Sequence, residues 1–178
     1  MTEYGGRNMR KIKTPISKED ISLLHVGDQI IISGHILCGR DAVLPKIVKM
    51  IQDGTVDELE EDLEGSVIFH TAVSPAGVGP TSSNKLEIES SFPVLSKGGV
   101  RIHLGKGKIS KETIQSLKEN NSVYAVIPPV TALLKSKTLS QKVVAFEEEG
   151  MEALHLLEVD EFPAIIAAAH GNSIYDEE

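Results

Sequence analysis

The sequence contains a single cysteine, Cys38, among 178 residues, and this scarcity excludes several kinds of site. One cysteine cannot form a disulfide within the chain, and it cannot supply two ligands to a zinc site. An iron–sulfur cluster held by four cysteines is also beyond this chain alone. Any such cluster used by the protein must therefore be held by another chain or domain.

Basic charge and aromatic side chains are also in short supply. Aromatic residues make up 4% of the chain, tryptophan is absent, and the formal net charge is −8. Nucleic-acid binders normally present a basic face, and single-strand binders add aromatic side chains on which bases stack. The composition therefore argues against a nucleic-acid partner.

Long apolar segments are missing as well. Runs such as residues 163–169 are far shorter than the roughly 20 residues that a membrane-spanning helix needs. The first 13 residues are polar and basic and lack the apolar core of a secretory signal. We therefore expect a cytoplasmic protein with no membrane partner.

The remaining composition is that of a globular protein, with 40% hydrophobic and 25% charged residues. The length suits one domain, and no repeat or linker interrupts it. We predict one domain over residues 14–175, preceded by an irregular basic lead-in at 1–13 and followed by an acidic tail at 176–178. We expect irregular structure, without a helix or strand pattern, up to about residue 20.

Short β-rich runs alternate with helical patterns along the chain. In residues 41–52, Leu44, Ile47, Val48 and Ile51 share one helix face, and Gly54 is a plausible stop. Ser110 suits the N-cap of a helix over 111–120, and 130–136 suits a short third helix. The predicted strands are 29–33, 66–70, 100–104, 122–127, 142–146, 153–159 and 164–169.

This alternation predicts an α/β fold with parallel strands at the centre. The last two predicted strands are joined by only four residues, 160–163. Such a connector allows a hairpin or a bend, so we expect a mixed sheet flanked by helices.

Three glycine-bearing loops follow predicted strands, and each supplies a cation: Arg40, Lys85 or Lys106. Loops at the carboxyl ends of strands bind anions in α/β proteins, and glycine lets the backbone approach the ligand. Three such cations in an acidic chain indicate a small dicarboxylate or phosphate. The alternative is a set of ordinary turns with solvated side chains. Neither the phosphate-loop nor the dinucleotide-binding glycine pattern is present.

Cys38 has two interpretations. Arg40 lies two residues away and would lower the pKa of the thiol, with His35 as a candidate base. The alternative is a small buried residue at the end of a strand. The histidines show no metal-ligand spacing, and four are interpreted as packed or capping residues: His70, His103, His155 and His170. The acidic run 147–149 is interpreted as a solvated loop that is also able to hold a partner's arginines or a metal.

Five stretches, taken in order, resemble the C-terminal domain or separate β-subunit of class I (iron–sulfur) fumarases and L(+)-tartrate dehydratases. Together they span about residues 14–175. They are 24–28 with 32–34, 39–42, 79–83, 105–107, and 149–164 with 171–175.

The resemblance implies a swivelling β/β/α fold and reversible hydration of fumarate to L-malate, or dehydration of tartrate to oxaloacetate. It implies a [4Fe-4S] cluster on a cysteine-rich α-subunit, where one iron acts as a Lewis acid. The assembly would be a hetero-oligomer, for which a dimer of heterodimers is one candidate.

By position in the family's motifs, Arg40 and Lys106 would bind substrate carboxylates, and Thr81 would supply a hydroxyl for proton transfer. Gly105 and Gly107 flank Lys106 in the same loop. Lys85 stands where the family usually has arginine. Arginine binds a carboxylate through two parallel hydrogen bonds, whereas the lysine ammonium acts as a point charge.

Two further departures are Leu44, where the family usually has histidine, and the short stretch 72–78. Leu44 falls on the apolar stripe of its predicted helix and is interpreted as core. The departures at Leu44 and Lys85 favour one alternative, a non-catalytic dicarboxylate-binding or assembly paralogue. A third possibility is a free-standing anion-binding domain, which would be a stable monomer that binds dicarboxylate without a partner.

Overall fold

The computed structural model describes residues 9–39, 42–59, 61–71, 73–74, 77–78, 85–127 and 131–174. Within these, the side chains of 73–74, 77–78, 85–88 and 131–132 are not described. All structural statements below concern these residues.

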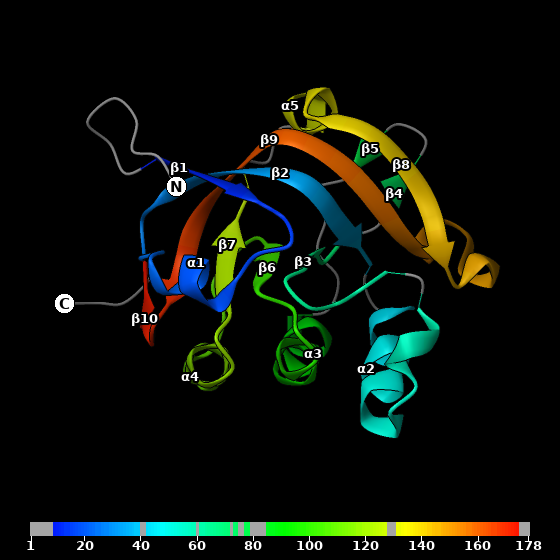
Figure 1. Cartoon of the computed structure of the whole chain (residues 1–178), viewed down its shortest axis with the longest axis horizontal. Coiled ribbons are helices and arrows are strands. Elements are labelled where there is room, and N and C mark those ends of the chain that lie inside the picture. Colours follow the sequence, from blue (N-terminus) through cyan, green and yellow to red (C-terminus); the bar gives the residue numbers. More distant parts are fainter. Residues whose placement is uncertain are drawn as a thin grey trace.

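A closed ring of five strands forms the centre of the molecule (Figure 1). Four of its strands run parallel to one another. The fifth strand pairs antiparallel with both the first and the fourth, and this pairing closes the ring. In ring order they are β2 (Gln29–Cys38), β3 (Val67–Phe69), β6 (Ile102–Gly105), β7 (Val123–Val126) and β9 (Leu154–Ala169). The prediction of a mixed sheet is therefore confirmed.

Further strands extend this sheet beyond the ring. β1 (Met9–Lys13) runs parallel to β2, while β8 (Thr138–Ala145) and β10 (Asn172–Ser173) pair antiparallel with β9. A separate two-stranded sheet joins β4 (Val73–Ser74) to β5 (Gly77–Val78).

Three helices lie in a row along one side of the ring, so the fold is α/β with flanking helices as predicted (Figure 1). They are α2 (Leu44–Asp53), α3 (Lys85–Lys97) and α4 (Lys111–Glu119). The smaller elements are α1 (Lys18–Ser22), α5 (Thr131–Ser136) and the 3₁₀ turns η1 (Val56–Glu58) and η2 (Glu147–Glu152).

The helix starts and stops follow the sequence signals. The Ser110 hydroxyl accepts from the Thr113 N–H at 3.2 Å and caps α4, and Gly54 ends α2 in a left-handed conformation. Leu44 and Ile47 are buried on α2, which confirms Leu44 as core.

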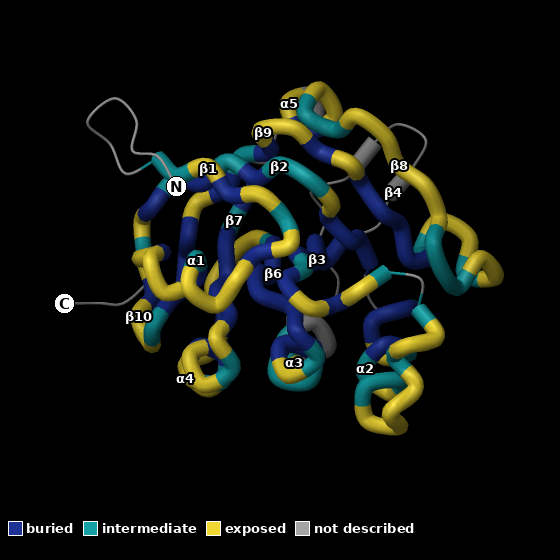
Figure 2. Tube along the Cα trace, viewed as in Figure 1, coloured by how far each residue is buried: buried dark blue, intermediate teal, exposed yellow. Residues whose placement is uncertain are grey.

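Apolar side chains fill the ring and also the space between the ring and the helices. Figure 2 shows where the buried residues lie along the chain, for example along β6 and β7. The interior is packed by alternate strand residues such as Ile32, Phe69 and Phe162. The intervening residues face the helices, for example Ile68 toward the α2 side. This alternation decides which strand residues can reach α3.

Of the two alternatives predicted for residues 160–163, the bend is confirmed and the hairpin is wrong. β9 runs unbroken for 16 residues, and the register with β2 shifts between Ile32 and Gly34, which face Phe162 and Val159. Glu161 takes a positive φ of 55° there. The four residues form a bulge that bends one strand, because both halves of β9 pair with the same strand β2.

The expectation of irregular structure up to residue 20 is also wrong, since β1 and α1 fall within it. Helix α3 was not predicted at all. Pro93 lies inside it and weakens its helical pattern.

Candidate functional site

The four parallel strands end at one edge of the sheet, and the loops of Arg40 and Lys106 begin there. The loop of Arg40 follows β2, the connection carrying Thr81 lies between β3 and α3, and the loop of Lys106 follows β6. Arg40 and Thr81 lie outside the described residues, and so does the side chain of Lys85. We refer to this end of the sheet as the carboxyl edge.

The Gly-Lys-Gly loop is held by short backbone contacts. Gly105 accepts from the Ile127 N–H at 3.2 Å, and Gly107 accepts from the Tyr124 hydroxyl at 3.1 Å. A Cβ on Gly105 would lie 3.1 Å from that hydroxyl, and Gly107 has a φ of 84°. The two glycines therefore let the loop turn sharply over Tyr124.

Lys106, at the centre of this loop, is exposed. Among the described side chains, no carboxylate lies within ion-pair distance of its ammonium. The ammonium of Lys106 is therefore exposed to solvent near the carboxyl edge.

Gly39 connects β2 to the loop of Arg40 and is buried. Its N–H donates to the Phe69 carbonyl at 3.1 Å, and a Cβ would lie 2.6 Å from Val43 Cγ2. The start of this loop is thus fixed against both β3 and the approach to α2.

Helix α2 is anchored on its outer side as well. Lys46 pairs with Glu149 at 2.9 Å and Glu148 at 3.4 Å, both of which belong to η2. The acidic run 147–149 therefore forms a 3₁₀ turn and not a plain loop, and two of its carboxylates have an internal partner.

Cys38 is fully buried, and burial raises the pKa of its thiol far above the usual range. The interpretation as an activated thiol is wrong, and the buried interpretation is confirmed. His35 is exposed, and it lies an odd number of residues away on an extended strand, so it faces the opposite side of the sheet.

A chain of three buried side chains lies beside the carboxyl edge. His70 follows β3, His103 lies in β6 and Ser96 lies in α3. His70 Nε2 is 3.0 Å from His103 Nδ1, and Ser96 Oγ is 2.9 Å from His103 Nε2. The expectation that these histidines are packed residues is confirmed, but their contact was not predicted.

The strand register explains why the sequence pattern missed this contact. Ile68 pairs with His103, so His70, two residues on, points to the same face toward α3. Adjacency of the two rings becomes visible once the parallel pairing of β3 and β6 is known.

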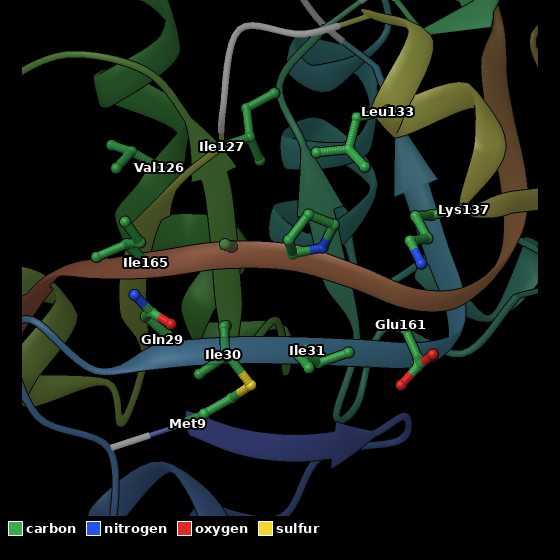
Figure 3. A pocket seen from close by; sticks show the side chains of 12 residues that line it. Met9, Gln29, Ile30, Ile31, Val126, Ile127, Leu133, Lys137, Glu161 and Ile165 are labelled. Atoms are coloured by element: carbon green, nitrogen blue, oxygen red, sulfur yellow. The ribbon is translucent and has the colours of Figure 1, made fainter. Parts of the chain in front are cut away.

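An apolar hollow of about 450 Å³ lies elsewhere on the molecule. It is bounded by β1, β2, β9 and α5, and Figure 3 shows Ile31, Leu133 and Ile165 around it, with Lys137 and Glu161 near one another. A cavity with this lining does not suit two carboxylates, because a buried carboxylate needs paired charges or hydrogen bonds.

No group of three or more histidine, cysteine or acidic side chains suited to a metal ion occurs among the described residues. The buried Cys38 cannot hold a cluster by itself. The described residues therefore do not fit an iron–sulfur cluster.

Comparison with known proteins bears directly on the resemblance carried by these loops. Residues 4–178 match the family model described as Fumarase C-terminus. The chain belongs to this family.

Relatives differ in how much of their own length the chain matches. It is 32% identical over 177 residues to a putative L(+)-tartrate dehydratase subunit beta of Methanocaldococcus jannaschii, covering 91% of this chain and 89% of that protein. It is 28% identical to the L(+)-tartrate dehydratase subunit beta of Escherichia coli K12, covering 95% of this chain and 88% of that protein. It is 32% identical to fumarate hydratase 2 of Leishmania major, covering 92% of this chain but 30% of that protein.

These names place the Fumarase C-terminus family among the hydro-lyases, of the class I fumarase and tartrate dehydratase type. The chain corresponds to nearly a whole beta subunit and to about a third of the fumarate hydratase. Within the described part of the chain, none of the helices has the length and apolarity to cross a membrane.

Proposed function

We propose that the chain is the β-subunit of a class I fumarate hydratase-type hydro-lyase that interconverts fumarate and L-malate. The observation that carries the proposal is the family match over 4–178, with the loops of Arg40 and Lys106 following strands that end at one edge and Thr81 in the connection from β3 to α3. The match to nearly entire beta subunits supports a role as a separate subunit.

In this proposal the chain binds and orients the C4 dicarboxylate. Arg40 and Lys106 hold its two carboxylates, and Lys85 adds a third positive charge at the start of α3. Charge-assisted hydrogen bonds of this kind fix both ends of the substrate, which orders it for reaction. The Thr81 hydroxyl then takes part in proton transfer, and a neighbouring base must activate it.

The iron–sulfur cluster belongs to a cysteine-rich α-subunit in this proposal. It supplies a Lewis acid for the hydroxyl and carboxylate of the substrate. The single buried cysteine of the present chain supports this division, because the cluster needs ligands that the chain lacks.

A second candidate is the β-subunit of L(+)-tartrate dehydratase, or of another hydroxy-acid dehydratase. The relatives that match over nearly their whole length carry that name. Lysine in place of arginine at position 85 also changes how a carboxylate is held. Turnover of fumarate, L-malate and L(+)-tartrate by the same preparation separates the two candidates.

The test is anaerobic co-purification from the native host, followed by assay of the complex. We expect an iron-containing, cysteine-rich partner and hydration of fumarate. Thr81→Ala is expected to lower kcat about 100- to 10,000-fold, as for loss of a proton-transfer group. Thr55→Ala is the matched control, because Thr55 is exposed just beyond the far end of α2.

Each other outcome has a definite meaning. A partner without turnover of fumarate but with turnover of tartrate selects the second candidate. Absence of an iron-containing partner contradicts both and leaves a binding or assembly paralogue. Near-normal turnover by Thr81→Ala removes Thr81 from the reaction.

A further inference from the structure

The chain of His70, His103 and Ser96 joins three elements around the carboxyl edge. His70 follows β3, at the start of the connection that carries Thr81, and Ser96 lies in the last turn of α3, the helix into which that connection leads. His103 lies two residues before Gly105, at the start of the Lys106 loop. The chain therefore ties the start of the Thr81-bearing connection, and the helix that follows it, to the base of the Lys106 loop.

Packing leaves the three side chains little freedom. His70, His103 and Ser96 are all at most 2% exposed. The Phe92 ring stacks on the His103 ring with 4.3 Å between the ring centroids, and its centroid lies 4.6 Å from that of the His70 ring. The backbone N–H of His70 also donates to the backbone carbonyl of Leu104 at 3.1 Å. This bond fixes the main chain beside the pair of rings.

Hydrogen-bond counting favours one direction along the chain. If Ser96 Oγ–H donates to His103 Nε2, then His103 Nδ1–H donates to His70 Nε2, and His70 carries its proton on Nδ1. The reverse direction leaves the Ser96 proton without an acceptor among the described contacts. It also leaves an unpaired lone pair on His70 Nδ1. The first arrangement leaves one unpaired group and the second leaves two.

Both rings are neutral in the folded protein. Burial lowers the pKa of His70 to about 3. Burial holds the pKa of His103 well below its usual range, and two smaller causes act in the same direction: the positive charge of Arg101 and the charge that His70 carries when it is protonated. Because neither ring gains a proton between pH 5 and 8, titration does not reverse the direction of the chain in that range.

We propose that the Ser96–His103–His70 chain is a positioning device that fixes the start of the Thr81-bearing connection, and helix α3 into which it leads, relative to the Lys106 loop. Its residues act through the loops and do not touch substrate. The inference rests on the proposed function, because it assigns these loops to the same reaction.

Breaking the chain at Ser96 tests the proposal without touching either ring. In the complex with the α-subunit, Ser96→Ala is expected to lower kcat about 10- to 100-fold with little change in KM, since misplacement by about 1 Å costs that much. Ser96→Thr keeps the hydroxyl and is expected to restore most of kcat.

The matched control is Ser122→Ala. Ser122 is equally buried and donates to the Val100 carbonyl at 2.6 Å, but it lies before β7, at the opposite edge of the sheet. We expect this variant to lose stability and keep kcat. Equal kcat values for Ser96→Ala and Ser122→Ala would show that the chain is merely structural.

Variants at His70 separate positioning from direct contact. His70→Gln places an amide near Nε2 and keeps the link to His103, whereas His70→Asn places its amide near Nδ1. The proposal expects Gln to retain more activity than Asn. The opposite order would overturn it in favour of a substrate contact through Nδ1.

A spectroscopic readout is independent of turnover. In ¹⁵N-histidine NMR spectra we expect His70 protonated on Nδ1 and neutral, with the tautomer altered in Ser96→Ala. A proton on His70 Nε2 in the wild type would overturn the assigned direction. A wild-type complex inactive on every C4 acid would instead defeat the proposed function, and the positioning role with it.

Discussion

At the scale of single residues, burial decides the chemistry of Cys38. Its position near Arg40 in the sequence suggests activation, but the side chain packs inside the ring and has no exposed surface. Removing the thiol from water disfavours the thiolate, so its pKa rises.

Thiol labelling tests this directly. We expect iodoacetamide or a disulfide reagent at pH 8 to leave native Cys38 unmodified and to modify it fully in urea. Cys38→Ser is expected to destabilise the fold by about 1–3 kcal/mol, because it buries a hydroxyl in place of a thiol. Rapid modification of the native chain at pH 8 would contradict the buried, protonated thiol.

At the scale of elements, Arg101 fastens the end of α4 to the sheet. Its guanidinium donates to the carbonyls of Asn120 and Asn121 at 2.6 and 3.0 Å, and it pairs with Glu64 at 3.2 Å. The carbonyls at a helix C-terminus lack partners within the helix, and a cation there also complements the helix dipole.

Arg101→Met is therefore expected to lower the free energy of unfolding by about 3 kcal/mol, the loss of two charge-assisted hydrogen bonds in a buried position. The free energy of unfolding of Arg101→Lys is expected to lie between those of the wild type and Arg101→Met, because an ammonium keeps the charge but lacks the planar arrangement of donors. Urea denaturation measures both. Glu64→Gln is the control and should cost less than about 1 kcal/mol, since that carboxylate is mostly exposed.

At the scale of the whole molecule, the buried histidines make stability depend on pH. In the unfolded chain His70 titrates near 6.5, whereas in the folded chain its pKa is about 3. Below 6.5 the unfolded state binds more protons than the folded state, so the free energy of unfolding falls as pH decreases toward 3. His103 acts in the same direction.

Urea denaturation between pH 8 and pH 4 measures this effect. We expect the free energy of unfolding to decline below about pH 6.5. The contribution of His70 and of His103 to this slope approaches about 1.4 kcal/mol per pH unit each, and the carboxylates add their own contribution. His70→Gln is expected to reduce the slope by about one histidine's share. An unchanged slope in that variant would show that His70 gains its proton without unfolding.

Several features of the fold could be predicted from local pattern alone. Strand–helix alternation indicated the α/β class, the spacing of Leu44 and Ile47 indicated the buried face of α2, and Ser110 and Gly54 marked helix ends. Each of these depends on neighbours within about one helical turn, so the sequence carries the whole signal. The family resemblance rested likewise on short motifs in order, and the match over 4–178 confirms it.

Other features were decided by the tertiary structure. Residues 160–163 form a bulge and not a hairpin because β2 pairs with both halves of β9, and β1 exists because β2 offers it an edge. The burial of Cys38 and the contact of His70 with His103 depend on partners 33 or more residues away or on closure of the ring. Local pattern determined many of the strands and helices, though not β1 or α3. Long-range pairing decided which side chains meet, because the free energy of such contacts appears only when distant strands lie side by side.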